Sequence, residues 1–387
     1  MSPGADARHH LYIHVPFCRL VCAYCDFVAV AGRRADIPRY VDALLSEMAV
    51  RPAPGELRTI YFGGGTPSQL DTAHVERLVA AAMERWNDTP AEVSLEANPS
   101  ARERPDWIGL RSAGVTRLSL GVQSLHDADL RELARGHSAG EAVAAYRAVR
   151  AAGFESVSLD LMYGIPGQTV AGWRRGVAAA LALGPDQLSL YSLSLAVTPD
   201  EWAGAPRAGA LRWRRAMAER QDDDVAAEQY RVAEELLDAA GFGHYELSSW
   251  ARPGHECVHN RAYWERLPYT GLGAGAHSFD GTTRSWNVRD VDAYIAAVER
   301  GASPREDGET VDERESAFET LALALRTLDG LSRSAFRDRF GDDPATRYAV
   351  AVDISATRGL IELDADSIRL TPAGRLLAND VLVAFIG

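Results

Sequence analysis

The chain has 387 residues, of which 47% are hydrophobic, and 41 basic and 54 acidic side chains give it a net charge of −13. This composition argues against disorder, general nucleic-acid binding and docking on an anionic membrane surface. No stretch reaches the about 18–20 apolar residues of a membrane span, and the N-terminus MSPGADARHH lacks the apolar region of a secretory signal. We therefore expect a cytoplasmic protein whose cysteines stay reduced.

Strand-like and helix-like segments alternate through the first half of the chain. Short apolar, β-branched runs are each followed by a helical pattern, which predicts a parallel sheet with helices outside it. An open doubly wound sheet and a partial barrel both satisfy the pattern. The expected strands cover residues 11–17, 58–64, 92–98, 116–124, 155–164 and 187–194, and helices are expected over 38–50, 73–86 and 139–153.

The second half has weaker and more varied signals. Residues 198–223 are expected to form a long connection with a helical part, followed by a helix over 224–241 and a strand over 244–250. Later segments predict a helix over 315–328, and then strand, turn, strand and helix over 359–385.

The change of pattern near residue 311 suggests three parts. We expect a core barrel over 1–200, a barrel extension and connecting region over 201–310, and a small winged-helix-like α+β module over 311–387. The module lacks a basic recognition helix, so we do not expect it to read DNA.

Three of the four cysteines lie in the short stretch PFCRLVCAYCDF, at Cys18, Cys22 and Cys25. Thiolates are soft ligands that suit zinc and iron–sulfur clusters. A structural zinc site usually has four ligands, and His14 is the nearest residue that could complete one. Three cysteines would instead leave one iron of a four-iron cluster with an open coordination position. The simplest alternative is three loop cysteines with no shared ligand.

Polar residues or glycines close all six predicted strands, at the edge where parallel β–α folds place their sites. The glycines of GGGTPS (63–68) would let the backbone approach a ligand closely, because they carry no Cβ. The other strand ends carry the cysteine loop, Glu96 and Asn98, Gln123 and Ser124, Asp160 ahead of YGIPGQT, and Ser192 with Ser194.

The cysteine spacing and GGGTP, both following strands, resemble the radical S-adenosylmethionine (SAM) superfamily. The resemblance implies an α/β fold with a partial (β/α)6 barrel of the TIM type. It also implies a [4Fe–4S] cluster on Cys18, Cys22 and Cys25, with SAM bound to the fourth iron through its amino and carboxylate groups.

The segments LYIHVPFC, CAYCDF, YFGGGTPS, EANP, GVQS, DLMYGIPGQT and HNRAYW resemble the oxygen-independent coproporphyrinogen III oxidase-like branch over nearly the whole chain. Carried over by position, the resemblance implies that SAM is contacted by Tyr12, Tyr24, Gly64, Gly65, Thr66, Glu96, Gln123, Arg135, Asp160 and Ser194. Taken singly, Arg135 or Asp160 could instead belong to an ordinary surface or strand-end ion pair.

Two relatives within this branch differ at the cysteine loop. The dehydrogenase has a longer segment ahead of the cluster and a further cysteine two residues after the third. Here 17 residues precede Cys18, and position 27 is Phe. The chain therefore resembles the HemW heme chaperone family, which implies that it binds heme and transfers it to an acceptor such as a respiratory-chain protein. In this function the cluster and SAM would gate transfer or homodimerisation, and peripheral membrane contact is compatible with it.

The alternative function is that of the coproporphyrinogen III dehydrogenase. In that reaction SAM is cleaved, and a 5′-deoxyadenosyl radical removes hydrogen from two propionate side chains to leave vinyl groups.

The motif HNRAYW is the feature that the resemblance connects with heme. An imidazole at His259 could ligate heme iron, and Tyr263 and Trp264 could pack on the porphyrin. Without the resemblance, a hydrogen-bonded loop histidine and two core aromatics would explain the motif. Cys257 is a further thiolate candidate, and His277 in GLGAGAHSF (271–279) is a second candidate for contact with heme or SAM.

Overall fold

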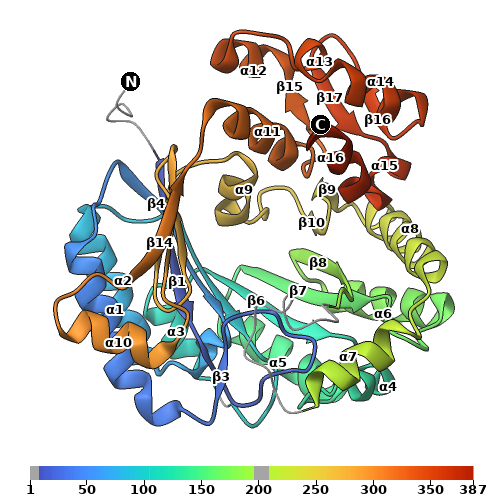
Figure 1. The fold of residues 1–387 in the computed structure, drawn as a ribbon. Helices are drawn as coiled ribbons and strands as arrows, with labels where there is room; N and C mark the ends of the chain where they lie inside the picture. The colour runs from blue at the N-terminus through green and yellow to red at the C-terminus, as the bar shows by residue number, and fades with distance from the viewer. Residues whose placement is uncertain (1–7, 104, 196–208, 387) are drawn as a thin grey trace.

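A computed structural model describes residues 8–103, 105–195 and 209–386 of the chain (Figure 1). Its main feature is one sheet, whose 12 described strands have the order β14-β13-β12-β11-β1-β4-β5-β6-β7-β8-β10-β9. The six central strands are parallel and match the six predicted ones, so the predicted partial (β/α)6 fold is confirmed. They are β1 (Arg8–Val15), β4 (Glu56–Gly64), β5 (Glu92–Ala97), β6 (Arg117–Gln123), β7 (Ser156–Tyr163) and β8 (Gln187–Ser192).

Helices cover the outer face of this sheet (Figure 1). The longer ones present an apolar stripe to the strands, as α1 does with Ile37, Tyr40, Leu44 and Met48 at helical spacing. The covering helices are α1 (Ile37–Val50), α2 (Thr72–Trp86), α3 (Trp107–Ser112), α4 (Asp127–Glu132), α5 (Ala139–Ala151) and α6 (Val170–Leu183), with short 3-10 turns η1 (Arg34–Asp36) and η2 (Pro67–Gln69).

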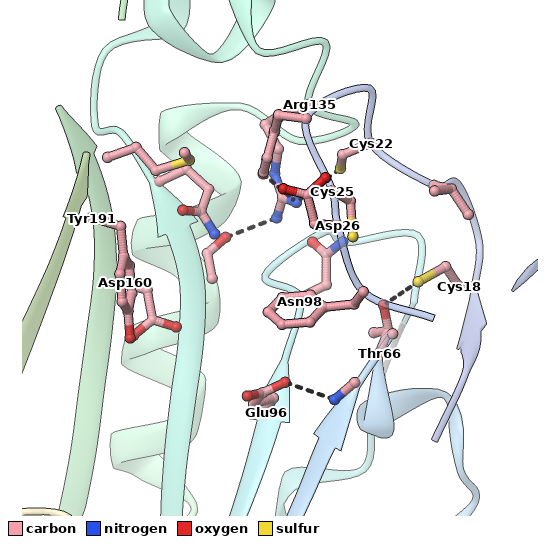
Figure 2. Close-up of a pocket in the computed structure, with 18 of the residues that line it drawn as sticks. Cys18, Cys22, Cys25, Asp26, Thr66, Glu96, Asn98, Arg135, Asp160 and Tyr191 are labelled. Atoms are coloured by element: carbon pink, nitrogen blue, oxygen red, sulfur yellow. Dashed lines mark hydrogen bonds between the residues drawn. The ribbon is translucent and has the colours of Figure 1, made fainter. Parts of the chain in front are cut away.

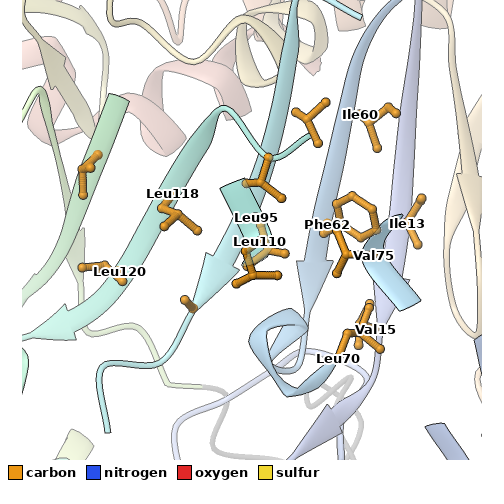
Figure 3. Close-up of a cluster of buried hydrophobic side chains, with 14 of the residues drawn as sticks. Ile13, Val15, Ile60, Phe62, Leu70, Val75, Leu95, Leu110, Leu118 and Leu120 are labelled. Atoms are coloured by element: carbon orange, nitrogen blue, oxygen red, sulfur yellow. The ribbon is translucent and has the colours of Figure 1, made fainter. Parts of the chain in front are cut away.

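The two faces of the central strands have opposite character. Figure 3 shows the outward side chains, among them Ile13, Phe62 and Leu120, packed in the core between sheet and helices. Because side chains alternate along a strand, the residues between them point into the barrel. There the chain carries polar groups such as Glu96 and Asp160. The barrel therefore has a dry outer core and a polar interior.

Further strands extend the sheet at both edges. On one side, β11 (Tyr269–Leu272) is parallel to β1, and β12 (His277–Phe279), β13 (Thr283–Asn287) and β14 (Arg305–Thr310) follow as an antiparallel meander. On the other side, β10 (Ser249–Ala251) pairs with β8, and β9 (Gly243–Glu246) pairs with β10. The helices of this region are α7 (Ala210–Ala218), α8 (Asp223–Ala239), α9 (Val258–Trp264) and α10 (Val291–Glu299).

The prediction of one strand over 244–250 is wrong, because the chain reverses there and forms the β9–β10 hairpin. The Glu246 carboxylate accepts a hydrogen bond from the backbone N–H of Ser248 at 3.1 Å and stabilises this turn. The expected boundary between residues 200 and 201 lies outside the described residues.

The C-terminal module has its own hydrophobic core, which includes Phe336, Ile368 and Phe385. A three-stranded antiparallel sheet and short helices form the predicted winged-helix-like arrangement. In Figure 1 the module lies at the end of the barrel away from the cysteine loop, with α9 between them. Its elements are α11 (Glu313–Ala324), β15 (Leu331–Ser332), α12 (Arg333–Phe340), α13 (Pro344–Arg347), α14 (Ala349–Thr357), β16 (Ile361–Leu363), β17 (Ser367–Leu370), α15 (Pro372–Leu376) and α16 (Ala378–Ile386).

None of the described helices combines the length and the apolar character that crossing a membrane requires.

Candidate functional site

A cavity of about 440 Å³ opens at the carboxyl ends of the central strands (Figure 2). Its lining brings together the loop after β1, the glycine turn after β4, and the ends of β5 to β8. The three clustered cysteines line it, with nine of the ten residues expected to contact SAM. These nine are Tyr24, Gly64, Gly65, Thr66, Glu96, Gln123, Arg135, Asp160 and Ser194.

The cysteine loop is held in place at both ends. Cys18 closes the short strand β2 (Phe17–Cys18), which pairs with β3 (Val30–Ala31) beyond the loop. Within the loop, the N–H of Cys25 donates to the carbonyl of Cys22 at 3.2 Å. At the start of the loop, the Cys18 sulfur lies 3.3 Å from the Thr66 hydroxyl. Pairing at the base and a turn at the tip therefore direct the thiols into the cavity.

A buried arginine from a distant helix braces the same loop. Arg214 on α7 has a side chain with 0% exposure. Its Nε donates to the carbonyl of Ala23 at 2.8 Å, and its Nη2 donates to the carbonyl of Cys25 at 3.0 Å. Its Nη2 also lies 2.8 Å from a carboxylate oxygen of Asp26. The loop conformation thus depends on a residue about 190 positions later in the chain.

The donor chemistry of the loop fits an iron–sulfur cluster. Burial raises the pKa of Cys18 to about 12 and that of Cys25 to about 11, so a cationic partner is needed to keep these sulfurs as thiolates. Among the described residues, no three His, Cys, Asp or Glu side chains converge as ligands of a single ion. A multi-iron cluster does not need such convergence, because each cysteine binds a different iron.

The glycine turn is shaped by close backbone contacts. A Cβ on Gly64, whose φ is +114°, would lie 2.5 Å from the ring of His14. A Cβ on Gly65 would lie 2.7 Å from the carbonyl oxygen of Pro16 and 3.0 Å from the Cys18 sulfur. Side chains are therefore excluded here, and the backbone of the turn lies directly against the cysteine loop.

His14 itself is an internal hydrogen-bonding residue. Its Nε2–H donates to the carbonyl of Val28 at 2.8 Å, and its Nδ1 accepts from the Tyr12 hydroxyl at 3.0 Å. Both ring nitrogens are thus used within the protein, and the arrangement gives no support to a zinc site completed by His14.

Two carboxyl groups give the cavity its electrostatic character. Burial, reinforced by the charge of Asp160, raises the pKa of Glu96 to about 7, and burial raises the pKa of Asp160 to about 6. Glu96 accepts from the Tyr61 hydroxyl at 2.8 Å. It also accepts from the Gly64 N–H at 3.2 Å, the dashed line at Glu96 in Figure 2. A carboxylate that is costly to ionise is stabilised by a bound cation, so the site favours a ligand with a positively charged group.

Arg135 lies across the cavity from Glu96. Its Nη2 donates to the Gly121 carbonyl at 2.8 Å, and its Nη1 lies 3.3 Å from both the Cys22 sulfur and the Tyr24 hydroxyl. Arg135 therefore brings positive charge to the cysteine loop and is oriented by a backbone carbonyl.

The sequence analysis did not single out several of the lining residues as contacts, among them Asp26, Phe27, Met162 and Tyr191. Tyr191 could have been found, because it lies two residues after Ser189 on β8, so that both side chains are on the face that points into the barrel. Phe27, 61% exposed, was noted only as a replaced cysteine. Arg214 carried no signal, because its role depends on a contact between distant segments.

Tyr12 does not lie where it was expected. It is absent from the lining of the cysteine cavity and instead lines a neighbouring cavity with His14. Its ring stacks on Tyr61, with 6.2 Å between ring centroids.

The motif HNRAYW forms α9, which closes the amino end of the barrel, away from the cysteines. The Glu92 carboxylate at the start of β5 accepts the backbone N–H groups of Val258 and His259 at 3.1 Å each. The Cys257 sulfur lies 3.6 Å from the same carboxylate and is buried. Cys257 is therefore part of the interior and distant in the fold from the other three cysteines.

His259 is not presented to a ligand in this structure. The residue has 0% exposure. Its Nδ1 lies 2.7 Å from the Thr59 hydroxyl and its Nε2 lies 2.9 Å from the Tyr263 hydroxyl. Burial, with a contribution from His10, lowers its pKa well below the ordinary value. Heme ligation by His259 would require the loss of a ring hydrogen bond and the displacement of α9.

The aromatic residues of the motif have separate surroundings. Trp264 carries the guanidinium of Arg326 over its ring at 4.8 Å, so it packs against the C-terminal module and lines neither of these two cavities. Tyr263 lines the cavity that also contains Tyr12. Of the three residues expected to contact heme, His259 and Tyr263 thus touch each other, whereas Trp264 packs elsewhere, against the C-terminal module.

The glycines of residues 271–279 approach protein atoms. A Cβ on Gly273 would lie 2.5 Å from the Tyr40 hydroxyl, and one on Gly271 would overlap the carbonyl of His277. None of residues 271–279 lines the cysteine cavity.

Comparison with known proteins agrees with this geometry. Residues 12–175 match the family model of the radical SAM superfamily, and residues 311–377 match that of the HemN C-terminal domain. The chain is 37% identical to the heme chaperone HemW of Mycobacterium tuberculosis, covering 100% of this chain and 97% of that one. It is 33% identical to the heme chaperone HemW of Bacillus subtilis, covering 97% and 98%.

A solved structure shows the same architecture. The coproporphyrinogen III oxidase HemN of Escherichia coli, a radical SAM enzyme, superimposes with a TM-score of 0.83 at 25% identity. The match covers 98% of this chain and 90% of that one, and so includes both the barrel and the C-terminal module.

Proposed function

The chain belongs to the HemW heme chaperone family within the radical SAM superfamily, and on that premise we propose that it binds heme and transfers it to an acceptor protein. The observation that carries this proposal is identity of 31–37% to heme chaperones over nearly their whole length. Phe27 supports it, because the side chain at this position cannot act as a fourth thiolate near the cysteine cavity.

We further propose that Cys18, Cys22 and Cys25 hold a [4Fe–4S] cluster and that SAM binds beside it. When bound, the cluster supplies an open iron coordination position and one-electron reducing chemistry. The chain's own groups would orient SAM. The glycine turn at Gly64 offers backbone atoms, and Glu96 offers a carboxylate to an ammonium group or to ribose hydroxyls.

Arg135 and Asp160 complete the proposed SAM site. A guanidinium suits the SAM carboxylate, and it lies beside the cysteine loop, where that carboxylate would approach the cluster. The Ser119 hydroxyl lies 2.8 and 3.0 Å from the two carboxylate oxygens of Asp160, which orients this carboxyl group in the wall of the cavity. Gln123 and Ser194 add polar groups at the same edge.

The acceptor that we propose is a heme-requiring protein, such as a component of the respiratory chain. The chaperone would meet this acceptor in the cytoplasm. The net charge of −13 disfavours direct adsorption on anionic lipid, so contact with a membrane would be peripheral and made through the acceptor. Homodimerisation would follow cluster and SAM binding. Size-exclusion chromatography with and without cluster and SAM tests the dimer, and vesicle flotation with and without acceptor tests the membrane contact.

The function is tested by two assays on one preparation. The purified chain is reconstituted anaerobically with iron and sulfide, and iron per chain is measured for the wild type and for serine variants of the four cysteines. We expect each of Cys18→Ser, Cys22→Ser and Cys25→Ser to lower iron content, and Cys257→Ser, the matched control, to leave it unchanged.

The reconstituted protein then receives SAM and dithionite, with coproporphyrinogen III in one arm and a heme titration in the other. Heme binding at one per chain without vinyl-bearing product supports the chaperone. Formation of vinyl-bearing product would overturn it in favour of the dehydrogenase, and absence of heme binding would overturn it outright.

A further inference from the structure

A second cavity lies beside the cysteine cavity, and the two share part of one wall. It has a volume of about 260 Å³ and is open to solvent. Asp26 and Phe27, directly after the last clustered cysteine, line both cavities. The proposed chaperone activity needs a place for heme, and the interior position of His259 does not provide one.

The second cavity carries an accessible imidazole. His277 on β12 is exposed and stacks on Trp286 of the neighbouring strand β13, with 5.7 Å between ring centroids. Among the described residues, its ring nitrogens have no hydrogen-bond partner. Partial burial, together with Arg284 and Arg289, lowers its pKa and so favours the neutral imidazole, which has a free lone pair. A neutral imidazole is the form that binds iron.

The same cavity offers a cation without a partner. Arg289 is exposed, and no carboxylate of the described residues lies within ion-pair distance of its guanidinium. An unpaired arginine is notable in a chain with a net charge of −13. Guanidinium groups suit carboxylates, and the lining also presents the aromatic rings of Phe27, Tyr263 and Tyr269.

We propose that heme binds in this second cavity, with His277 as the protein ligand of the iron and Arg289 paired with a propionate. The proposal rests on the proposed function and assigns its ligand site. Phe27 and the tyrosine rings would contact the porphyrin. One protein ligand from an exposed strand leaves the opposite face of the iron accessible, which suits a protein that must release heme to an acceptor.

The test is an anaerobic heme titration of the full chain, followed by absorbance and electron paramagnetic resonance of the bound heme. His277→Ala should weaken binding about tenfold or more, because even loss of an outer partner of a metal ligand costs about 10–100-fold. His277→Met should retain bound heme with an altered ligand-field spectrum. Arg289→Ala should weaken binding about threefold at this exposed position, and Arg289→Lys should partly restore it.

The matched controls are His126→Ala, which removes an exposed histidine elsewhere, and His259→Ala, each with a thermal melt to verify folding. His126→Ala should bind heme as the wild type does. If wild-type protein binds heme and His277→Ala keeps the same affinity and spectrum, the assignment is overturned while the chaperone function stands. The assignment to His277 would also be overturned if a folded His259→Ala variant lost the heme spectrum while His277→Ala kept it. If the wild type binds no heme, the proposed function fails first.

Discussion

Glu96 should make the folded protein less stable as the pH rises, and Glu96→Gln should remove this effect. The folded-state pKa of about 7 lies above the ordinary value of 4.5, so between these values the folded chain holds a proton that the unfolded chain releases. Stability is therefore lost as the pH rises through this window. Each pH unit is worth about 1.4 kcal/mol, so ionised Glu96 costs about 3 kcal/mol at pH 8 and almost nothing at pH 4.

The substitution also has a cost of its own. Glu96 accepts hydrogen bonds from Tyr61 and Gly64, and an amide has one acceptor oxygen, so Gln loses about 1 kcal/mol at every pH. The balance is a gain of about 2 kcal/mol for Glu96→Gln at pH 8 and a loss of about 1 kcal/mol at pH 4. The two stability curves should cross near pH 5.

The assay is thermal or urea unfolding of the two proteins from pH 4 to pH 8, without SAM, whose cationic group would offset the ionisation cost. Glu84→Gln on the exposed face of α2 is the matched control for loss of a carboxylate. A Glu96→Gln variant that is less stable than wild type at pH 8, or a difference that does not change with pH, would refute the reasoning.

Three other substitutions test the supports of the site and of the module. Arg214→Met should lower the yield of reconstituted cluster, measured as iron per chain, because the cysteine loop loses its hydrogen bonds to this side chain. Gly64→Ala should destabilise the fold by about 2 kcal/mol or more and abolish SAM binding in calorimetry, because a Cβ would meet His14 at a positive φ. Glu319→Ala should leave the buried guanidinium of Arg266 unpaired, lower stability by about 2 kcal/mol and speed proteolysis between barrel and C-terminal module.

Matched controls separate these effects from general damage. Arg212→Met removes an exposed cation from the same helix α7 and should not change iron content. Gly281→Ala has a similar positive φ of +103° with open space around it, so it measures the backbone cost alone. Full iron loading of Arg214→Met would contradict the first prediction. Equal effects of the two glycine variants would contradict the second. An unchanged proteolysis pattern for Glu319→Ala would contradict the third.

The barrel and much of the site could be predicted from local patterns. The alternation along β5 and β7 places Glu96 and Asp160 on one face, and parallel strands bring their carboxyl ends to one edge. Three cysteines within eight positions must lie near one another whatever the fold. The hairpin over β9 and β10 was missed, because a turn within a short polar segment leaves the strand pattern almost unchanged.

The sequence by itself determined which side chains could do chemistry at the strand ends, because strand periodicity and short spacing are local properties. Tertiary structure decided which of the other candidates are available. It buried His259 on the inner face of α9, left His277 open on β12, and brought Arg214 to the cysteine loop from far along the chain. The physical reason is that burial and bracing depend on contacts between distant segments, and the packing of the whole sheet creates those contacts.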